Sequence, residues 1–473
     1  MLVCMQPAIA STDTAAVESP CQCAKETPAS LDQAPAESAK NIILMISDGA
    51  GFNAFDACSY YQFGRRGAQV YDGFPVKLAC THYMLNDDGQ PQGYDPERTW
   101  MDCGFVRGEE RKSFVTDSAA AATAIYTGVK TSYGRVSMDF LKKTLPTIAE
   151  WADGKGKSTG VVTSVQLCHA TPACVSAHNV SRKNYAEIAN DMIRRSGLDL
   201  IMGAGHPLFD NNGNRVAAGS EAYDYVGGVD TWNALKHGTL AGGWTFIDEK
   251  NAFETLANRS KDLPARVIGV AQARDTLQHN RDGKDMGNLN TNVPSLETMT
   301  RAALNVVSQN DEGFFLMVEG GAVDWANHGN NLARMIEEQI DFNRSVEAAV
   351  AWVGRNGGWD QNLLIVTADH ECGLLWGSGT YIDADQNGTF ESAHDTFVKW
   401  MPLTNNGAGN LPGVQYGSNN HTNTLVPLYA AGRGAIRFYW TLDGWDQSAH
   451  EQWDFSGLYV DNTDIFRIML GKP

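Results

Sequence analysis

Six stretches of uninterrupted apolar residues restrict the fold more than any other feature of this sequence. They are the segments 41–51, 158–172, 198–205, 313–324, 362–370 and 423–432. A strand that is apolar without alternation is covered on both faces, which is typical of a parallel sheet between layers of helices. We therefore expect an α/β fold with one large, mostly parallel central sheet sandwiched between helix layers.

The segments between these stretches carry helical patterns. Apolar residues between 331 and 355 follow helical spacing before a Gly357-Gly358 stop, and Pro146 is expected to open another helix that runs through Trp151. Residues 206–300 and 374–420 fit the alternation of strands and helices poorly, so we predict that they form loops or insertions over the active face. We expect one catalytic domain over residues 41–473.

The composition of the chain excludes several classes of protein. Its 473 residues have a formal net charge of −18 with 43% hydrophobic residues. A nucleic-acid binder needs clustered basic residues, and a disordered acidic chain cannot bury a core of this size. No apolar run approaches the roughly 18 residues that cross a bilayer.

The first 40 residues are expected to lie outside the folded domain. Residues 1–10 end in Ala8-Ile9-Ala10, a pattern that predicts the remnant of a truncated signal peptide, with an ordinary chain terminus as the alternative. Residues 11–40 are rich in Ala, Ser, Thr, Pro and Glu and are predicted to form a disordered tether. An export signal favours a periplasmic or secreted protein.

The nine cysteines show no CxxC spacing of a structural zinc site. In an exported protein Cys168 and Cys174 are close enough in sequence to pair across a short loop. Free buried thiols are the alternative, and the sequence leaves the two open.

One helix start combines a hydroxyl group with an anion site. In VTDSAAAATAIYTGVKT, residues 115–131, the Ala-rich run predicts a helix through Thr127 with Gly128 as its stop. In one interpretation Ser118 or Asp117 is the N-cap. In the other, Ser118 is a nucleophile that faces a phosphate, because free N–H groups at a helix start attract anions. No GxSxG motif surrounds Ser118, so as a nucleophile it requires activation by a metal.

Residues of the types that bind metals end several of the predicted strands. Asp324 and His328 are four apart and share one face if a helical turn begins there. A set of Asp and His without thiolates suits catalytic zinc or a harder cation. The remaining members of this group are Asp48, Glu319, Asp369, His370 and His421.

Six segments, read together and in order, resemble the alkaline phosphatases over residues 41–432. They are SDGAG, TDSAAAATA, HATPACVSAHNVSRK, VEGGAVDWANH, TADH and NHTNTLVPLYAAG. The resemblance implies a homodimeric, periplasmic or secreted phosphomonoesterase with two zinc ions and one magnesium ion.

The resemblance also assigns a role to each matching residue. Ser118 corresponds to the serine that becomes phosphorylated, and Arg182 to the arginine that clamps the phosphate, although taken alone Arg182 is an ordinary surface arginine. The implied metal ligands form three sets: Asp324, His328 and His421 for one zinc ion; Asp48, Asp369 and His370 for the other; and Asp48, Thr171 and Glu319 for magnesium.

Two positions near the expected site depart from the best-known bacterial members, which carry Asp and Lys where this chain has His169 and Trp325. Other members carry His and Trp. The His169 position lies near the magnesium ion. The Trp325 position normally carries a lysine that contacts phosphate through water, so its loss is expected to weaken phosphate binding.

A second cation motif lies outside these segments. Asp383, Asp385 and Asn387 match the start of a calcium loop, but the twelfth position is His394, which lacks the second carboxylate oxygen of the usual Glu. We weigh an additional calcium site here against a plain turn rich in Asp and Asn.

The main alternatives are a phosphodiesterase or sulfatase of the same superfamily, and a metal-binding protein without activity. The diesterases and sulfatases generally use Thr or a modified Cys as the nucleophile, and they lack this arginine. A protein without activity is expected to have lost Ser118, Arg182 or a metal ligand, and all of these are present.

Overall fold

The computed structural model describes residues 38–108, 115–217, 219–259, 261–382 and 398–472. Residues 1–10, most of the predicted tether, and Asp383, Asp385 and Asn387 lie outside the described residues. Within the described part of the chain, no helix has both the length and the apolar character that a membrane span requires.

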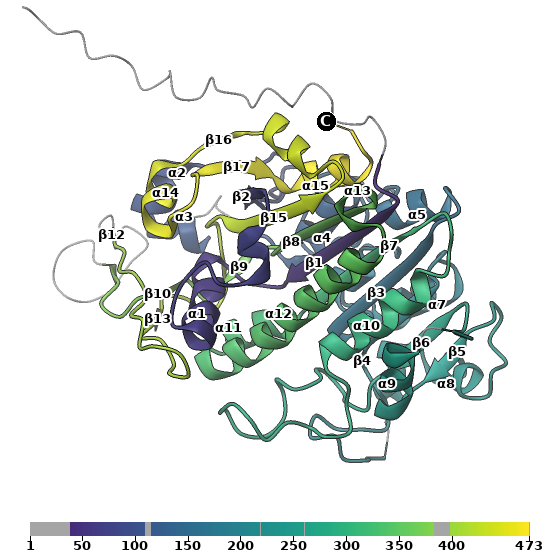
Figure 1. Ribbon diagram of the computed structural model, residues 1–473. Coiled ribbons are helices and arrows are strands. Elements are labelled where there is room, and N and C mark those ends of the chain that lie inside the picture. The colour runs from purple at the N-terminus through teal and green to yellow at the C-terminus, as the bar shows by residue number, and fades with distance from the viewer. Residues whose placement is uncertain (1–37, 109–114, 218, 260, 383–397, 473) are drawn as a thin grey trace, which may run out of the picture. The chain divides into compact units, whose positions relative to one another are not determined.

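A single mixed sheet, mostly parallel, organises the fold (Figure 1). Its strand order within the described residues is β16 (Gly444–Trp445), β17 (Leu458–Asp461), β2 (Val76–Thr81), β15 (Val426–Gly432), β8 (Asn362–Thr367), β1 (Asn41–Ser47), β7 (Phe314–Gly320), β3 (Ser158–Gln166), β4 (Leu200–Ala204), β6 (Val267–Val270) and β5 (Thr245–Ile247). The predicted fold class is confirmed, and all six apolar stretches contribute a strand.

The register of the central strands brings their carboxyl ends to one edge. Strand β1 is parallel to β7 on one side and to β8 on the other. Ile46 of β1 lies opposite Glu319 of β7 and Thr367 of β8. Side chains that follow these strands therefore meet at the same edge, where ligands bind in open α/β sheets.

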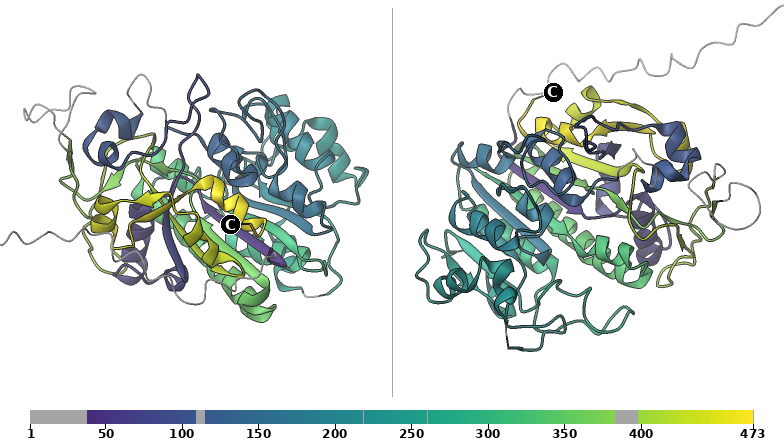
Figure 2. Two further views of the ribbon diagram at one scale, coloured as in Figure 1. Left: turned by 90° about the horizontal axis from the view of Figure 1, so that it is seen from above. Right: turned by 180° about the vertical axis from the view of Figure 1, so that it is seen from behind.

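Helices cover both faces of the sheet, as the view from above in Figure 2 shows. On one face, α10 (Leu296–Val307) and α12 (Leu332–Arg355) pack against each other and against the central strands. On the other lie α4 (Ser118–Thr127), α5 (Ile148–Asp153) and α15 (Asn462–Met469). The apolar stripe predicted over 331–355 is confirmed as α12, which buries Ile336, Val346 and Val353.

Local signals explain where α4 begins and ends. The Asp117 side chain accepts a hydrogen bond from the Ala120 N–H at 3.1 Å and caps the helix, and Gly128 ends it with a φ of 71°. Glycine tolerates this left-handed backbone conformation better than any other residue. Asp117 is therefore the N-cap, and Ser118 is free to be the first residue of the helix.

Two sequence expectations were wrong in part. Pro146 does not open α5, because Thr147 caps it in a reciprocal pair of hydrogen bonds with Glu150. The segment 206–300 is more than loops: besides β5 and β6 at the sheet edge, it forms η4 (Ser220–Val226), α8 (Val229–Lys236) and α9 (Lys250–Asn258). The strands of this segment are short and its helices are rich in polar residues, so the sequence pattern did not reveal that strands and helices alternate there.

Two other segments named in the sequence analysis are also described. Within 374–420, the described residues form only short strand pairs, such as β10 (Leu375–Trp376) with β13 (Gln415–Tyr416). Cys168 and Cys174 are free and buried, which settles the choice between a disulfide and free thiols at this pair.

Candidate metal centre and nucleophile

A cavity of about 500 Å³ opens at the carboxyl edge of the sheet. Residues from distant parts of the chain line it: Val115, Thr116, Ser118, Tyr133, His169, Arg182, His279, Asn280, Asp324, Trp325, His328, Asn420 and His421. It thus gathers Ser118, Arg182 and one of the three predicted sets of metal ligands.

Ser118 stands at the start of α4 and is almost fully buried. Its Oγ lies 3.2 Å from Nε2 of His370, a residue 252 positions away. The serine hydroxyl therefore has a nitrogen base or metal ligand on one side and the free N–H groups of a helix start on the other.

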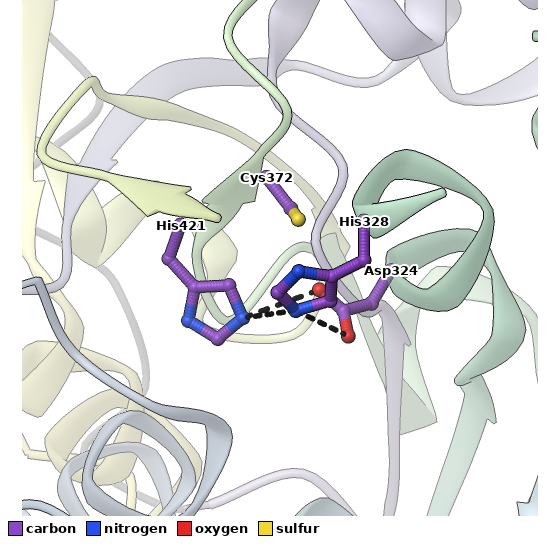
Figure 3. A group of neighbouring side chains, drawn as sticks. All are labelled: Asp324, His328, Cys372 and His421. Carbon is purple, nitrogen blue, oxygen red and sulfur yellow. Dashed lines mark hydrogen bonds and ion pairs between the residues drawn. The ribbon is translucent and has the colours of Figure 1, made fainter. Parts of the chain in front are cut away.

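Asp324, His328 and His421 converge on one point (Figure 3). Helix α11 (Ala322–His328) carries the first two, and Nε2 of His328 lies 3.5 Å from a carboxylate oxygen of Asp324. His421 begins β14 (His421–Thr422), and its Nε2 lies 3.3 Å from the other oxygen. The prediction that a helical turn brings Asp324 and His328 to one face is confirmed.

The hydrogen bonds of the two imidazoles indicate a cation between them. Nδ1 of His328 lies 2.7 Å from the Asn419 carbonyl, and Nδ1 of His421 lies 2.7 Å from the Thr116 carbonyl. A carbonyl only accepts, so each Nδ1 is the donor and each neutral ring keeps its lone pair on Nε2. The two Nε2 atoms are 3.1 Å apart. Two facing lone pairs repel, so either a proton or a metal ion lies between these two nitrogens.

Asp48, Asp369 and His370 form a second group beneath Ser118, and all three are fully buried. Nε2 of His370 lies 3.5 Å from Asp48 and 3.2 Å from Asp369. Asp48 follows β1, and the next residue, Gly49, has a φ of 71°. A side chain at Gly49 would begin 2.7 Å from the Cα of Asp324, so only glycine lets the two ligand segments approach.

Asp48 also belongs to a third group. A ligand oxygen of Asp48 lies within 4.8 Å of ligand atoms of His169 and Glu319. Thr171, in α6 (Ala170–Ala173), donates to Asp48 over a long 3.5 Å, and the Thr163 hydroxyl donates to Glu319. The structure thus brings together every predicted metal ligand, and Asp48 is shared between two groups.

Unpaired acceptor atoms at these groups fit the presence of cations. Among the described residues, one buried oxygen each of Asp48, Glu319, Asp324 and Asp369 has no hydrogen-bond partner. A buried acceptor without a partner is costly, and a bound cation removes that cost. The donor set of carboxylates, imidazoles and a hydroxyl is one that catalytic metal ions use.

The ionisation of the site reflects its crowded carboxylates. Burial, and then the neighbouring charges of Asp369 and Asp324, raise the pKa of Asp48 well above its ordinary value. Burial also raises the pKa of Glu319 to about 7. Burial opposes ionisation of Asp324 as well, but the neighbouring His421 and then His328 outweigh burial and lower its pKa. The protein therefore holds more negative charge here than it can stabilise alone.

Arg182 points into the cavity rather than into solvent. Its Nη1 donates to Asp117 at 3.0 Å, and its Nη2 lies 3.1 Å from Nε2 of His169. His169 in turn stacks edge to face on Trp325, with 5.8 Å between ring centroids. His169 and Trp325 are thus in contact with each other and with the cavity.

Sequence reasoning missed several residues of this region. Tyr133, His279 and Asn280 line the cavity, although nothing in their local sequence marks them. Asp117 was considered only as a cap, and it also holds Arg182. Cys372 lies within 4.8 Å of the ligand atoms of Asp324, His328 and His421. The one feature of the sequence that could have marked Cys372 is its position two residues after the TADH segment.

The sequence of the whole chain is similar to those of known proteins. The sequence model of the family described as alkaline phosphatase matches residues 39–434. The alkaline phosphatase of Escherichia coli (strain K12) is 31% identical over 370 residues, which cover 73% of this chain and 73% of that protein. Alkaline phosphatase 3 of Bacillus subtilis (strain 168) is 30% identical over 341 residues, which cover 71% of this chain and 61% of that protein.

Solved structures show the same fold. The Thermus thermophilus alkaline phosphatase matches with a TM-score of 0.62 at 21% identity, covering 92% of this chain and 91% of that one. The alkaline phosphatase of the Antarctic bacterium TAB5 matches with a TM-score of 0.60 at 24% identity, covering 93% and 98%. At these identities the structural likeness bears on the fold alone.

Proposed function

The chain belongs to the alkaline phosphatase family of metal-dependent phosphomonoesterases, and from this premise we propose that it hydrolyses phosphate monoesters through a phosphoserine at Ser118. In the first step Ser118 Oγ attacks phosphorus, the ester P–O bond breaks and the alcohol leaves. In the second step water attacks the phosphoserine, which releases inorganic phosphate and restores the serine. Two in-line displacements give retention at phosphorus.

The chain's own residues orient both steps. Arg182 presents a planar guanidinium fork to two phosphate oxygens, and Asp117 fixes that fork by its ion pair. The free N–H groups at the start of α4 face the same phosphate. Ser118 Oγ lies 3.2 Å from Nε2 of His370, the atom that would bind the zinc ion beside the serine.

We propose two zinc ions and one magnesium ion as the bound metals. Asp324, His328 and His421 would hold one zinc ion; Asp48, Asp369 and His370 the other; and Asp48, Thr171 and Glu319 the magnesium ion. Bound metals of this kind lower the pKa of a hydroxyl or water and neutralise charge on the transferred phosphoryl group.

One observation carries the proposal more than any other: Ser118 Oγ lies 3.2 Å from His370 Nε2 in a cavity that also holds Arg182 and a second group of ligands. A serine that served only as the first residue of a helix has no need of these neighbours. In this position the serine has a place for metal activation and a partner for the phosphate.

The decisive experiment compares hydrolysis of a chromogenic phosphomonoester and a phosphodiester at neutral and alkaline pH, before and after chelation. We expect preferential monoester hydrolysis that chelation abolishes and that zinc with magnesium restores. Activity that survives complete metal removal, verified by elemental analysis, would overturn the proposed mechanism. Preferential cleavage of the diester or of a sulfate ester would support the phosphodiesterase or sulfatase alternative.

Assembly, localisation and a further cation are also proposals. Family membership supports a homodimer and a periplasmic or secreted location. Small-molecule phosphate monoesters are the expected partners, with no specific binding to nucleic acid. Sedimentation of the purified chain tests the dimer, and calcium titration of an Asp383→Ala variant tests the additional calcium site.

Replacing Trp325 with lysine is predicted to strengthen inhibition by inorganic phosphate. Trp325 lines the cavity beside His169, and a lysine there adds a positive charge close to the bound anion. We expect the phosphate inhibition constant to fall by about tenfold, since one partly screened charge interaction is worth about 1 kcal/mol. Trp445→Lys makes the same change at an exposed tryptophan outside the cavity, and there the constant is expected to stay unchanged. Equal constants for Trp325→Lys and the parent enzyme would contradict the prediction.

Replacing Arg182 with alanine is predicted to lower kcat/KM by about 10- to 100-fold. This range corresponds to the loss of one charge-assisted hydrogen bond, which contributes about 1.5–3 kcal/mol. Arg182→Lys keeps the charge but loses the fork, so we expect an intermediate effect. Arg195→Ala removes an exposed arginine from a surface ion pair and serves as the control. An Arg182→Ala enzyme with unchanged kcat/KM and unchanged phosphate inhibition would show that Arg182 does not bind the phosphate.

A further inference from the structure

Cys372 differs from the other described free cysteines in its surroundings. Cys58, Cys80, Cys168 and Cys174 belong to the main apolar core, whereas Cys372 does not. Its Sγ lies within 4.8 Å of the ligand atoms of Asp324, His328 and His421. Figure 3 shows the sulfur pointing toward the other three side chains.

The backbone fixes this position. Cys372 ends β9 (Glu371–Cys372), which pairs antiparallel with β14, and Cys372 lies directly opposite His421 in that register. Directly opposed residues in such a pair project to the same face with about 5 Å between Cβ atoms. The Cys372 N–H also donates to the Gly49 carbonyl at 3.0 Å. The strand pair that delivers His421 therefore delivers the thiol as well.

A second observation at the same place points to a ligand. Oδ1 of Asp324 is buried and has no hydrogen-bond partner among the described residues, while Nε2 of His421 faces it at 3.3 Å. The two imidazole nitrogens beside it face each other at 3.1 Å with both outer nitrogens bonded to carbonyls. A cation at this point satisfies the carboxylate, both imidazoles and the sulfur together.

Cys372 approaches the three ligands from a side that does not face the cavity. Asp324, His328 and His421 line the cavity, and Cys372 does not. The sulfur is almost fully buried and reaches the group from the protein interior. A ligand on that side leaves the cavity side open for the substrate or water.

We propose that Cys372 Sγ is a fourth protein ligand of the metal ion held by Asp324, His328 and His421. The thiol proton leaves to solvent as the sulfur–metal bond forms, and no atom changes oxidation state. This inference rests on the proposed function only in taking the same three residues as metal ligands.

A sulfur ligand changes which metals the site prefers. Thiolates favour zinc and cobalt over magnesium and manganese, which prefer oxygen ligands. The site also gains a second negative charge beside Asp324, so it holds a divalent ion more tightly. We expect removal of the sulfur to weaken retention of one zinc ion per chain by at least about tenfold.

Zinc X-ray absorption on the unmodified holoenzyme tests the inference directly. We expect a sulfur scatterer at about 2.3 Å from zinc, beside nitrogen and oxygen scatterers at about 2.0–2.2 Å. A zinc-loaded enzyme with only nitrogen and oxygen around its metals would overturn the proposal. This measurement needs no variant, so it decides the question even if a Cys372 variant does not fold.

Cobalt substitution provides the matched comparison. In the cobalt-loaded enzyme we expect a thiolate-to-cobalt charge-transfer band in the near ultraviolet that disappears in Cys372→Ser. Cys58→Ser removes another buried thiol, which lies outside the metal groups, and should keep the band. A band that survives in Cys372→Ser, or that is absent from the parent enzyme, would contradict the assignment.

The outcomes also separate this inference from the proposed function. Phosphomonoester hydrolysis by a zinc enzyme without a sulfur scatterer would leave the function standing and remove Cys372 as a ligand. A sulfur-bound zinc ion in a protein without phosphomonoesterase activity would establish the ligand and overturn the function.

Discussion

Replacing Ser118 with alanine is expected to lower kcat for phosphomonoesters by at least about 10³-fold, the scale of losing an attacking nucleophile. The substitution removes one oxygen from a buried position at the start of α4. Asp117 caps that helix independently, so the helix and the cavity should persist. Phosphate binding should therefore change far less than kcat.

Two measurements distinguish loss of the nucleophile from loss of structure. Acid quenching during turnover of a radiolabelled phosphomonoester should trap a phosphorylated chain in the parent enzyme and none in Ser118→Ala. Ser345→Ala removes another buried serine hydroxyl, which donates to the Asp341 carbonyl, and is expected to retain activity. If Ser118→Ala still accumulates a covalent phosphoenzyme, the nucleophile is another residue.

Replacing Asp48 with asparagine is expected to lower kcat/KM by at least about 100-fold, because Asp48 is shared between two groups of ligands. Loss of one carboxylate should weaken the site beneath Ser118 and the site at Glu319 together. Elemental analysis should show a fall in both zinc and magnesium per chain. A fall in only one metal would show that Asp48 does not bridge the two sites.

The same substitution should affect stability in opposite directions with and without metal. In the metal-free protein Asp48 is a fully buried carboxylate beside Asp369, Asp324 and Glu319, and burial with these charges raises its pKa well above the ordinary value. Replacing this carboxyl group, which is buried among three others, should stabilise the metal-free chain by about 1–3 kcal/mol. With metals bound, the ligand is lost and the variant should melt below the parent enzyme.

Thermal melts with and without chelator check this reversal. Asp56→Asn is the control. Asp56 is also a largely buried aspartate with a raised pKa, but it pairs with Arg66 and lies outside the metal groups. Its effect on stability should have the same sign with and without metal. If Asp48→Asn destabilises the chelated protein, the crowded carboxylates are not a source of instability.

The sequence was sufficient for the features that depend on local pattern. Continuous apolar runs predicted the strands, since burial on both faces leaves no polar side. Strand ends then marked Asp48, Glu319 and Asp369, because parallel strands place their carboxyl ends at one edge. The Asp324 and His328 pair followed from helical spacing, and the family resemblance supplied the roles of Ser118 and Arg182.

Only the tertiary structure decided which side chains share a point in space. The sequence cannot show that Cys372 lies opposite His421, because that register depends on a pairing between strands separated by nearly fifty residues. It likewise cannot show that Arg182 is held by Asp117, or that β5 and β6 extend the sheet. The reason is physical: burial and helix periodicity act along neighbouring residues and leave their mark in the sequence, whereas the meeting of distant segments is fixed by packing of the whole core.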